Sequence, residues 1–143
     1  MNKTDLTAKA QTTINASSEK VWESLTDPKM IKEYMFGTNV SSDREKGSPI
    51  IWKGEMNNKK YEDKGEILEI VPNKILKYTH FSPISGQPDK PENYHTVAIA
   101  LNEEKNKTSL TLTQDHNDSE KARSEPEKSW NGMMESLKKF FEK

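Results

Sequence analysis

The chain has 143 residues, of which 31% are hydrophobic and 31% charged, and these proportions indicate one domain with a modest core. The net charge of −1, from 22 basic and 23 acidic residues, argues against nucleic acid as a main partner, because phosphate binding needs a basic surface. Without cysteine, a secretory signal or an apolar run of the roughly 20 residues that span a bilayer, we expect a cytoplasmic protein with no disulfides.

The first part of the chain predicts a strand and two short helices. Residues 1–9 are expected to be a flexible polar lead-in to a single domain over residues 10–143. Alternating residues predict a strand from Ala10 to Asn15. Ser17 and Ser18 can cap a short helix, and Asp27 can cap a second one with Pro28 at its first position. This order favours an α+β arrangement.

Alternation of apolar and polar residues predicts strands through the middle of the chain. The segments are Thr38–Ser42, Ile50–Met56, Lys60–Val71, Ile75–Phe81, Tyr94–Asn102 and Lys107–His116. Apolar residues change face along the third segment, so we expect a bulge or bend near Gly65. Gly54 marks a point where backbone or ligand could approach closely. Residues 82–92, with three prolines, are expected to be a loop, and a turn over 102–106 would join the last two strands into a hairpin.

The end of the chain carries the strongest helical pattern. Its apolar residues recur at spacings of three and four, at Trp130, Met133, Met134, Leu137, Phe140 and Phe141. Pro126 disfavours an unbroken helix before it, so the helix is expected to begin near Glu125. Gly132 inside the helix should cost roughly 1 kcal/mol relative to alanine, which suggests close packing or a slight bend. We expect the last three apolar residues in the core and the first three beside a pocket.

Four segments in this order resemble a known family pattern. They are ASSEKVWESLTDP (16–28), GEILEIVPNKILKYT (65–79), TSLTLTQDH (108–116) and W-x3-M-x2-L-x2-F (130–140). The pattern resembles the START-like (SRPBCC) superfamily, specifically bacterial domains similar to the C-terminal domain of the activator of heat-shock-protein-ninety ATPase. The resemblance covers about residues 10–143. It implies a helix-grip fold, in which a curved antiparallel sheet wraps around the C-terminal helix and leaves a cavity between them.

The resemblance says less about function. The superfamily includes lipid and hormone carriers, polyketide aromatase/cyclases and co-chaperone domains, and it has no common catalytic motif to carry over to this chain. Direct chaperone activation is not expected, because in eukaryotic members it involves an additional N-terminal domain.

Three histidines lie in phase with the apolar faces of their strands, at His80, His95 and His116. Alternating strand directions bring these positions to one end of the sheet, where neighbouring strands about 4.8 Å apart would let them converge. One interpretation is a polar patch that orients a ligand, with Gln114 nearby; the other is a hydrogen-bonded, inert rim. No HxH or HExxH spacing is present, so no metal is expected.

Aromatic and methionine residues could line a pocket or simply form core. Met30, Tyr34 and Phe36 would then lie near its entrance. Neither a buried carboxylate pair nor a nucleophile motif stands out, so no catalytic residue and no cofactor are predicted. The predicted ligand-binding residues are Trp52, Tyr78, His80, His95, Gln114, His116, Trp130, Met133 and Met134.

The leading hypothesis is a non-enzymatic binding protein that holds a small apolar or aromatic molecule between the sheet and the C-terminal helix. Two alternatives stay open. One is an aromatase/cyclase-like or hydrolytic enzyme that uses a cavity histidine with Tyr78 as acid and base. The other is a protein-interaction domain with a chaperone-linked or other protein partner.

Overall fold

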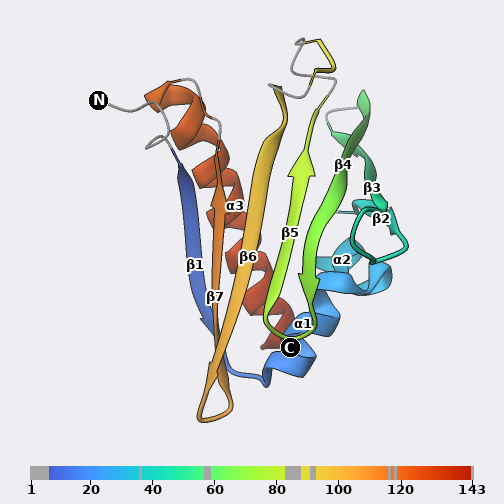
Figure 1. The fold of residues 1–143 in the computed structure, drawn as a ribbon. Helices are drawn as coiled ribbons and strands as arrows, with labels where there is room; N and C mark the ends of the chain where they lie inside the picture. The colour runs from blue at the N-terminus through green and yellow to red at the C-terminus, as the bar shows by residue number, and fades with distance from the viewer. Residues whose placement is uncertain are drawn as a thin grey trace.

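The computed structural model describes residues 7–35, 37–56, 59–82, 88–90, 93–115, 117 and 119–142. Seven strands form one antiparallel sheet in the order β1-β7-β6-β5-β4-β3-β2, and the long helix α3 packs against it (Figure 1). This arrangement confirms the predicted helix-grip fold. The elements are β1 (Ala8–Ile14), α1 (Ser18–Thr26), α2 (Pro28–Tyr34), β2 (Asn39–Ser42), β3 (Pro49–Met56), β4 (Lys59–Val71), β5 (Ile75–His80), β6 (His95–Glu104), β7 (Lys107–Gln114) and α3 (Glu120–Phe141).

The two short helices begin at the predicted capping residues. The Ser17 side chain accepts a hydrogen bond from the backbone N–H of Lys20, and the Asp27 side chain accepts one from Lys29. The first strand, predicted from Ala10 to Asn15, instead begins two residues earlier, because Ala8 already pairs with Gln114 of β7. The proposed lead-in over residues 1–9 falls mostly outside the described residues.

The sheet contains all the predicted strands, with ends that differ by up to two residues, and two internal details also differ. The irregularity of β4 lies between Ile67 and Glu69, where the pairing with β5 shifts, and not at Gly65. The hairpin of β6 and β7 is confirmed, but its turn is only Lys105 and Asn106, both at positive φ (52° and 65°), shorter than the predicted turn over 102–106. Two central residues at positive φ are the geometry whose twist matches that of paired strands.

Helix α3 begins at Glu120, so the predicted start near Glu125 is wrong. The side chain of Ser119 caps the helix by accepting a hydrogen bond from Ala122 N–H at 3.1 Å. Arg123 forms ion pairs with both Glu120 and Glu127, one on each side of Pro126. These contacts hold the first turns together although Pro126 lacks the backbone N–H that the helix would use.

The core lies between the sheet and the helices. Leu137 is fully buried, and Phe140 and Phe141 are partly buried against the core, as predicted. The largest fully buried side chains include Ile14, Ile67, Leu110, Leu112, Met134 and Leu137. Close packing does not explain Gly132, since a Cβ built there would meet no atom within 4 Å.

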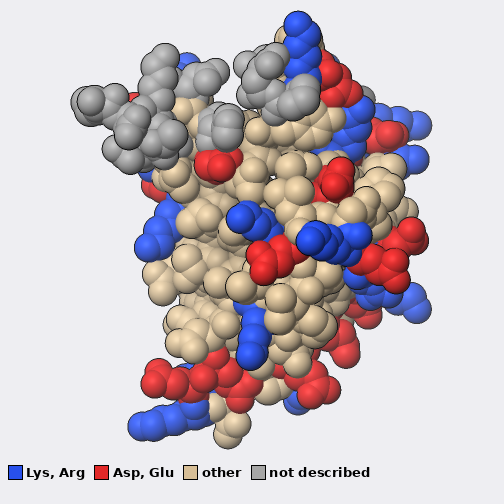
Figure 2. Space-filling model, in the orientation of Figure 1, with Lys and Arg blue, Asp and Glu red and all other residues tan. Residues whose placement is uncertain are grey.

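The surface carries both signs of charge. On the face turned to the viewer, lysines and arginines alternate with aspartates and glutamates among neutral side chains, and the described residues of this face form no continuous basic stripe (Figure 2). Within the described part of the chain, no helix is long and apolar enough to cross a membrane.

Candidate functional site

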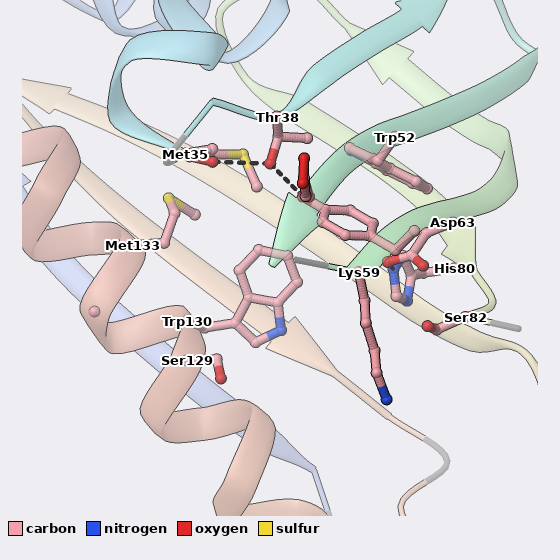
Figure 3. Close-up of a pocket in the computed structure, with 13 residues that line it drawn as sticks. Met35, Thr38, Trp52, Lys59, Asp63, His80, Ser82, Ser129, Trp130 and Met133 are labelled. Atoms are coloured by element: carbon pink, nitrogen blue, oxygen red, sulfur yellow. Dashed lines mark hydrogen bonds and ion pairs between the residues drawn. The ribbon is translucent and has the colours of Figure 1, made fainter. Parts of the chain in front are cut away.

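A cavity of about 840 Å³ lies between α3 and the strands β3 and β4 (Figure 3). Its walls are mostly apolar, with aromatic and methionine side chains from both the sheet and the helix. Exposed Glu55 and Lys59 also line it, and Ser82 and Ser129 add hydroxyl groups. The apolar wall residues are Met35, Trp52, Tyr61, Trp130 and Met133.

Tyr61 is held against β3 by the absence of a side chain at Gly54. The two residues are paired across β3 and β4, and a Cβ at position 54 would overlap the Tyr61 hydroxyl and lie 2.6 Å from its Cζ. The Tyr61 hydroxyl is 2.7 Å from Thr38 Oγ1, which itself donates to the carbonyl of Met35 at 2.8 Å. Because the one Thr38 proton is already used, Tyr61 is the donor of this pair. This chain of bonds ties the end of α2 to the cavity wall (Figure 3).

A carboxylate–imidazole pair forms the polar part of the wall. His80 Nε2 lies 3.0 Å from Asp63 Oδ2, and both side chains are largely buried. The His80 ring also packs edge-on against Trp52, with ring centroids 5.0 Å apart. Among the described residues, the second oxygen of Asp63, Oδ1, is buried and has no hydrogen-bond partner. Buried carboxylate oxygens without a partner are uncommon in folded proteins and call for an explanation.

A smaller cavity of about 340 Å³ adjoins the main one and contains the next histidine. His80 and His95 are directly paired across β5 and β6, which confirms the prediction that these two positions converge. His95 and Gln114 line only the smaller cavity, whereas Trp130 lines both. The Trp130 indole donates a hydrogen bond to Gln114 Oε1 at 2.7 Å. His116 lies outside the described residues.

Several predicted residues belong to the core and not to the wall. Tyr78 and Met134 are buried but line neither cavity; the Tyr78 ring packs on Trp52 at 5.1 Å. Burial raises the pKa of Tyr78, which makes it a poorer proton donor or acceptor near neutral pH. Tyr34, predicted at the entrance, is also core, with its hydroxyl donating to the Ser24 carbonyl. Met30 lines neither cavity, and position 36 is not described.

Sequence reasoning did not single out Asp63, although it is the partner of His80. The available signal was the two-residue period that places Asp63 on the same face as Tyr61, in a strand whose apolar pattern is ambiguous. Within the described residues, no group of three or more His, Asp or Glu side chains could hold a metal ion. The apolar wall and the polar side chains described above can hold an apolar molecule and offer it a few hydrogen-bonding groups on one side.

Comparison with known proteins identifies relatives of this arrangement. The family described as Activator of Hsp90 ATPase homolog 1-like protein matches residues 15–142. The solution structure of ChR145 from Cytophaga hutchinsonii is 54% identical over 95% of this chain and 93% of that one, with a TM-score of 0.83. No curated protein matches the chain at a significant level.

Two more distant structures share the fold. CalU16 from Micromonospora echinospora is 22% identical over 94% of this chain and 75% of that one, with a TM-score of 0.76. The Aha1 dimer from Colwellia psychrerythraea is 21% identical over 92% of both chains, with a TM-score of 0.71. At these identities the likeness shows the fold alone.

Proposed function

We propose that this chain, which belongs to the family of Activator of Hsp90 ATPase homolog 1-like proteins, binds a small, largely apolar molecule in the cavity between its sheet and α3. The observation that carries the proposal is the cavity of about 840 Å³ with its aromatic and methionine walls. Ligand pockets are typically about 300–1,000 Å³, mostly apolar, with a few placed polar groups, and this one has both properties.

The composition of the wall supports a flat or ring-containing ligand. Trp52 and Trp130 come from opposite sides, one from the sheet and one from α3 (Figure 3), and Tyr61 of β4 adds a third aromatic ring to the wall. Aromatic faces favour stacking and edge contacts with other rings. The flexible side chains of Met35 and Met133 can adapt to ligands of different shape.

The test is a binding titration followed by tryptophan fluorescence, against a library of lipids and aromatic compounds. Met133→Trp should fill part of the cavity and weaken binding by about tenfold or more, equivalent to about 1.4 kcal/mol. Glu135→Trp is the matched control, since it adds the same side chain at an exposed position of α3 away from the wall. Failure of every compound to bind, or equal affinity for both variants, would contradict the proposal.

The pair formed by Asp63 and His80 favours a second candidate, an enzyme that uses His80 as an acid or base on a molecule in the cavity. The aromatase/cyclase-like mechanism considered from sequence would lose one partner, because Tyr78 lies off the wall and burial raises its pKa. Mass spectrometry of bound compounds distinguishes the two functions. Conversion that disappears in His80→Ala while binding persists supports the enzyme, whereas recovery of every ligand unchanged supports the binding protein.

The cellular setting is part of the proposal. A cysteine-free sequence is compatible with a cytoplasmic location, where disulfides are rarely used. The family description also names a chaperone ATPase, so a chaperone-linked protein partner stays a prediction from the resemblance. Capture of partners from native cytosol, with and without ligand in the cavity, tests it.

A further inference from the structure

The two cavities form one site with a large apolar chamber and a small polar one. They share five residues, which form the border between them: Asp63, His80, Ser82, Ser129 and Trp130. The larger chamber contains most of the aromatic and methionine wall, whereas the smaller one adds His95 and Gln114. A single ligand can therefore place an apolar body in one chamber and a polar group at the border or beyond it.

The hydrogen bonds of the protein determine which polar atoms are available there. His95 Nδ1 lies 2.8 Å from the backbone carbonyl oxygen of Asp115, and a carbonyl oxygen can only accept. His95 Nδ1 therefore carries the proton, and in the neutral ring Nε2 is left as an acceptor.

The same reasoning applies to the pair at the border. With Asp63 as a carboxylate, its Oδ2 accepts a hydrogen bond from His80 Nε2, so Nδ1 of neutral His80 is an acceptor. The Asp63 carboxylate is a third acceptor: its Oδ1 is buried and without a partner among the described residues, while the side chain as a whole is 18% exposed and lines both cavities. Gln114 contributes a donor through its NH₂ group, whose orientation is set by the hydrogen bond that its Oε1 accepts from Trp130.

Groups that can only accept therefore outnumber groups that can only donate, because the Ser82 and Ser129 hydroxyls and the Asn93 amide can do either. No Lys or Arg side chain lines the smaller cavity within the described chain. A carboxylate or phosphate on a ligand would meet the Asp63 carboxylate, and the one Lys or Arg among the described lining residues of the two cavities is the exposed Lys59 of the larger one. We infer that the ligand is a ring-containing molecule with a hydroxyl or amine as hydrogen-bond donor, which binds Asp63 at the border of the two chambers. This inference rests on the proposed binding function and specifies its ligand class.

The inferred ligand class is tested by measuring the affinity of three naphthalene compounds: 2-naphthol, 2-methoxynaphthalene and 2-naphthoate. The naphthol should bind at least about tenfold more tightly than the methoxy compound. The methoxy compound has no hydrogen-bond donor, so it would leave the acceptors at the border without a partner. The naphthoate should bind most weakly. Asp63→Asn should reduce the naphthol advantage to about threefold or less, while Glu62→Gln, at the exposed neighbouring position, should leave it unchanged.

The outcomes test the inferred donor group and the binding function separately. Equal binding of naphthol and methoxynaphthalene, or tightest binding of naphthoate, would overturn the donor-group inference and leave the apolar cavity function intact. Absence of binding by all three compounds up to about 1 mM would remove the binding function for this ligand class and the inference with it. The comparison of compounds uses the unaltered protein, so it decides the question even if Asp63→Asn fails to fold.

Discussion

Gly65 is the position where one added methyl group should disturb both the fold and the site. A Cβ built on Gly65 would overlap the carbonyl oxygen of Thr79 in β5 and lie 2.6 Å from its carbonyl carbon. Both are backbone atoms, so they cannot rotate away as a side chain would. The strands next to this point are held by two backbone hydrogen bonds between Lys64 and Phe81, at 3.0 and 2.8 Å.

The expected loss of stability for Gly65→Ala can be estimated from these contacts. Forcing a methyl group into a closely packed position costs about 1–3 kcal/mol, and each backbone bond weakened by the separation of the strands adds about 1 kcal/mol. Alanine recovers about 0.4–1 kcal/mol by restricting the unfolded chain. With both bonds weakened we expect a net loss of about 2–4.6 kcal/mol, which lowers Tm by about 7–15 °C in a chain of this size.

Urea denaturation and thermal unfolding followed by circular dichroism measure this loss. Gly54→Ala is the control, because its Cβ would meet only the outer atoms of the Tyr61 ring, which can turn away. Rotation of the ring and loss of its hydrogen bond to Thr38 cost about 1 kcal/mol each, and alanine recovers about 0.4–1 kcal/mol, so we expect a net loss of about 1–1.6 kcal/mol. Gly65 follows Asp63 by two residues in β4 and lies against the backbone of His80 in β5, so Gly65→Ala should also weaken ligand binding. Equal stability of the two variants would refute the argument from backbone overlap.

Three further changes test other parts of the structure. Pro126→Ala should stabilise the protein by about 1–2 kcal/mol in urea denaturation by restoring a helical hydrogen bond, and an unchanged midpoint would contradict this. Trp130→Phe should cost about 1–2 kcal/mol in the same assay, because Gln114 Oε1 loses its donor; no loss would show that the bond is dispensable. Burial raises the pKa of Tyr34 and Tyr78 in the folded state, so the unfolded state loses these protons first and stability should fall above about pH 10 by about 1.4 kcal/mol per pH unit for each tyrosine. Urea denaturation across this range should show a smaller slope after Tyr34→Phe, and an equal slope would count against the buried phenol.

Much of the fold could be predicted because its signals are local. The alternation in β6 and β7 places Val97, Leu110 and Leu112 inside, and all three are fully buried. The start of α3 was missed because Pro126 is a strong local signal against a helix. The Ser119 cap and the ion pairs of Arg123 compensate for Pro126. These residues lie several positions away from the proline, so the local pattern does not reveal them.

The site was harder to predict from sequence than the fold, for a physical reason. Alternation shows which residues of a strand face inward, but it does not show whether the inward side meets the helix or a void. Trp52 and Tyr78 are both inward and in ring contact, yet only Trp52 lines a cavity. Asp63 was missed because its role comes from His80, which is 17 positions away and next to it only after β4 and β5 pair.

The cavity itself follows from how α3 divides its contacts. The helix packs mainly against β1 at one edge of the sheet and against α2, which follows α1. The strands β3 and β4 lie toward the opposite edge, so the helix does not cover them directly (Figure 1). Large side chains such as Trp130 and Met133 reach toward that half of the sheet without filling the space. The same topology that buries Leu137 therefore leaves a pocket one turn earlier on α3, and substitutions in the wall should change ligand choice more than stability.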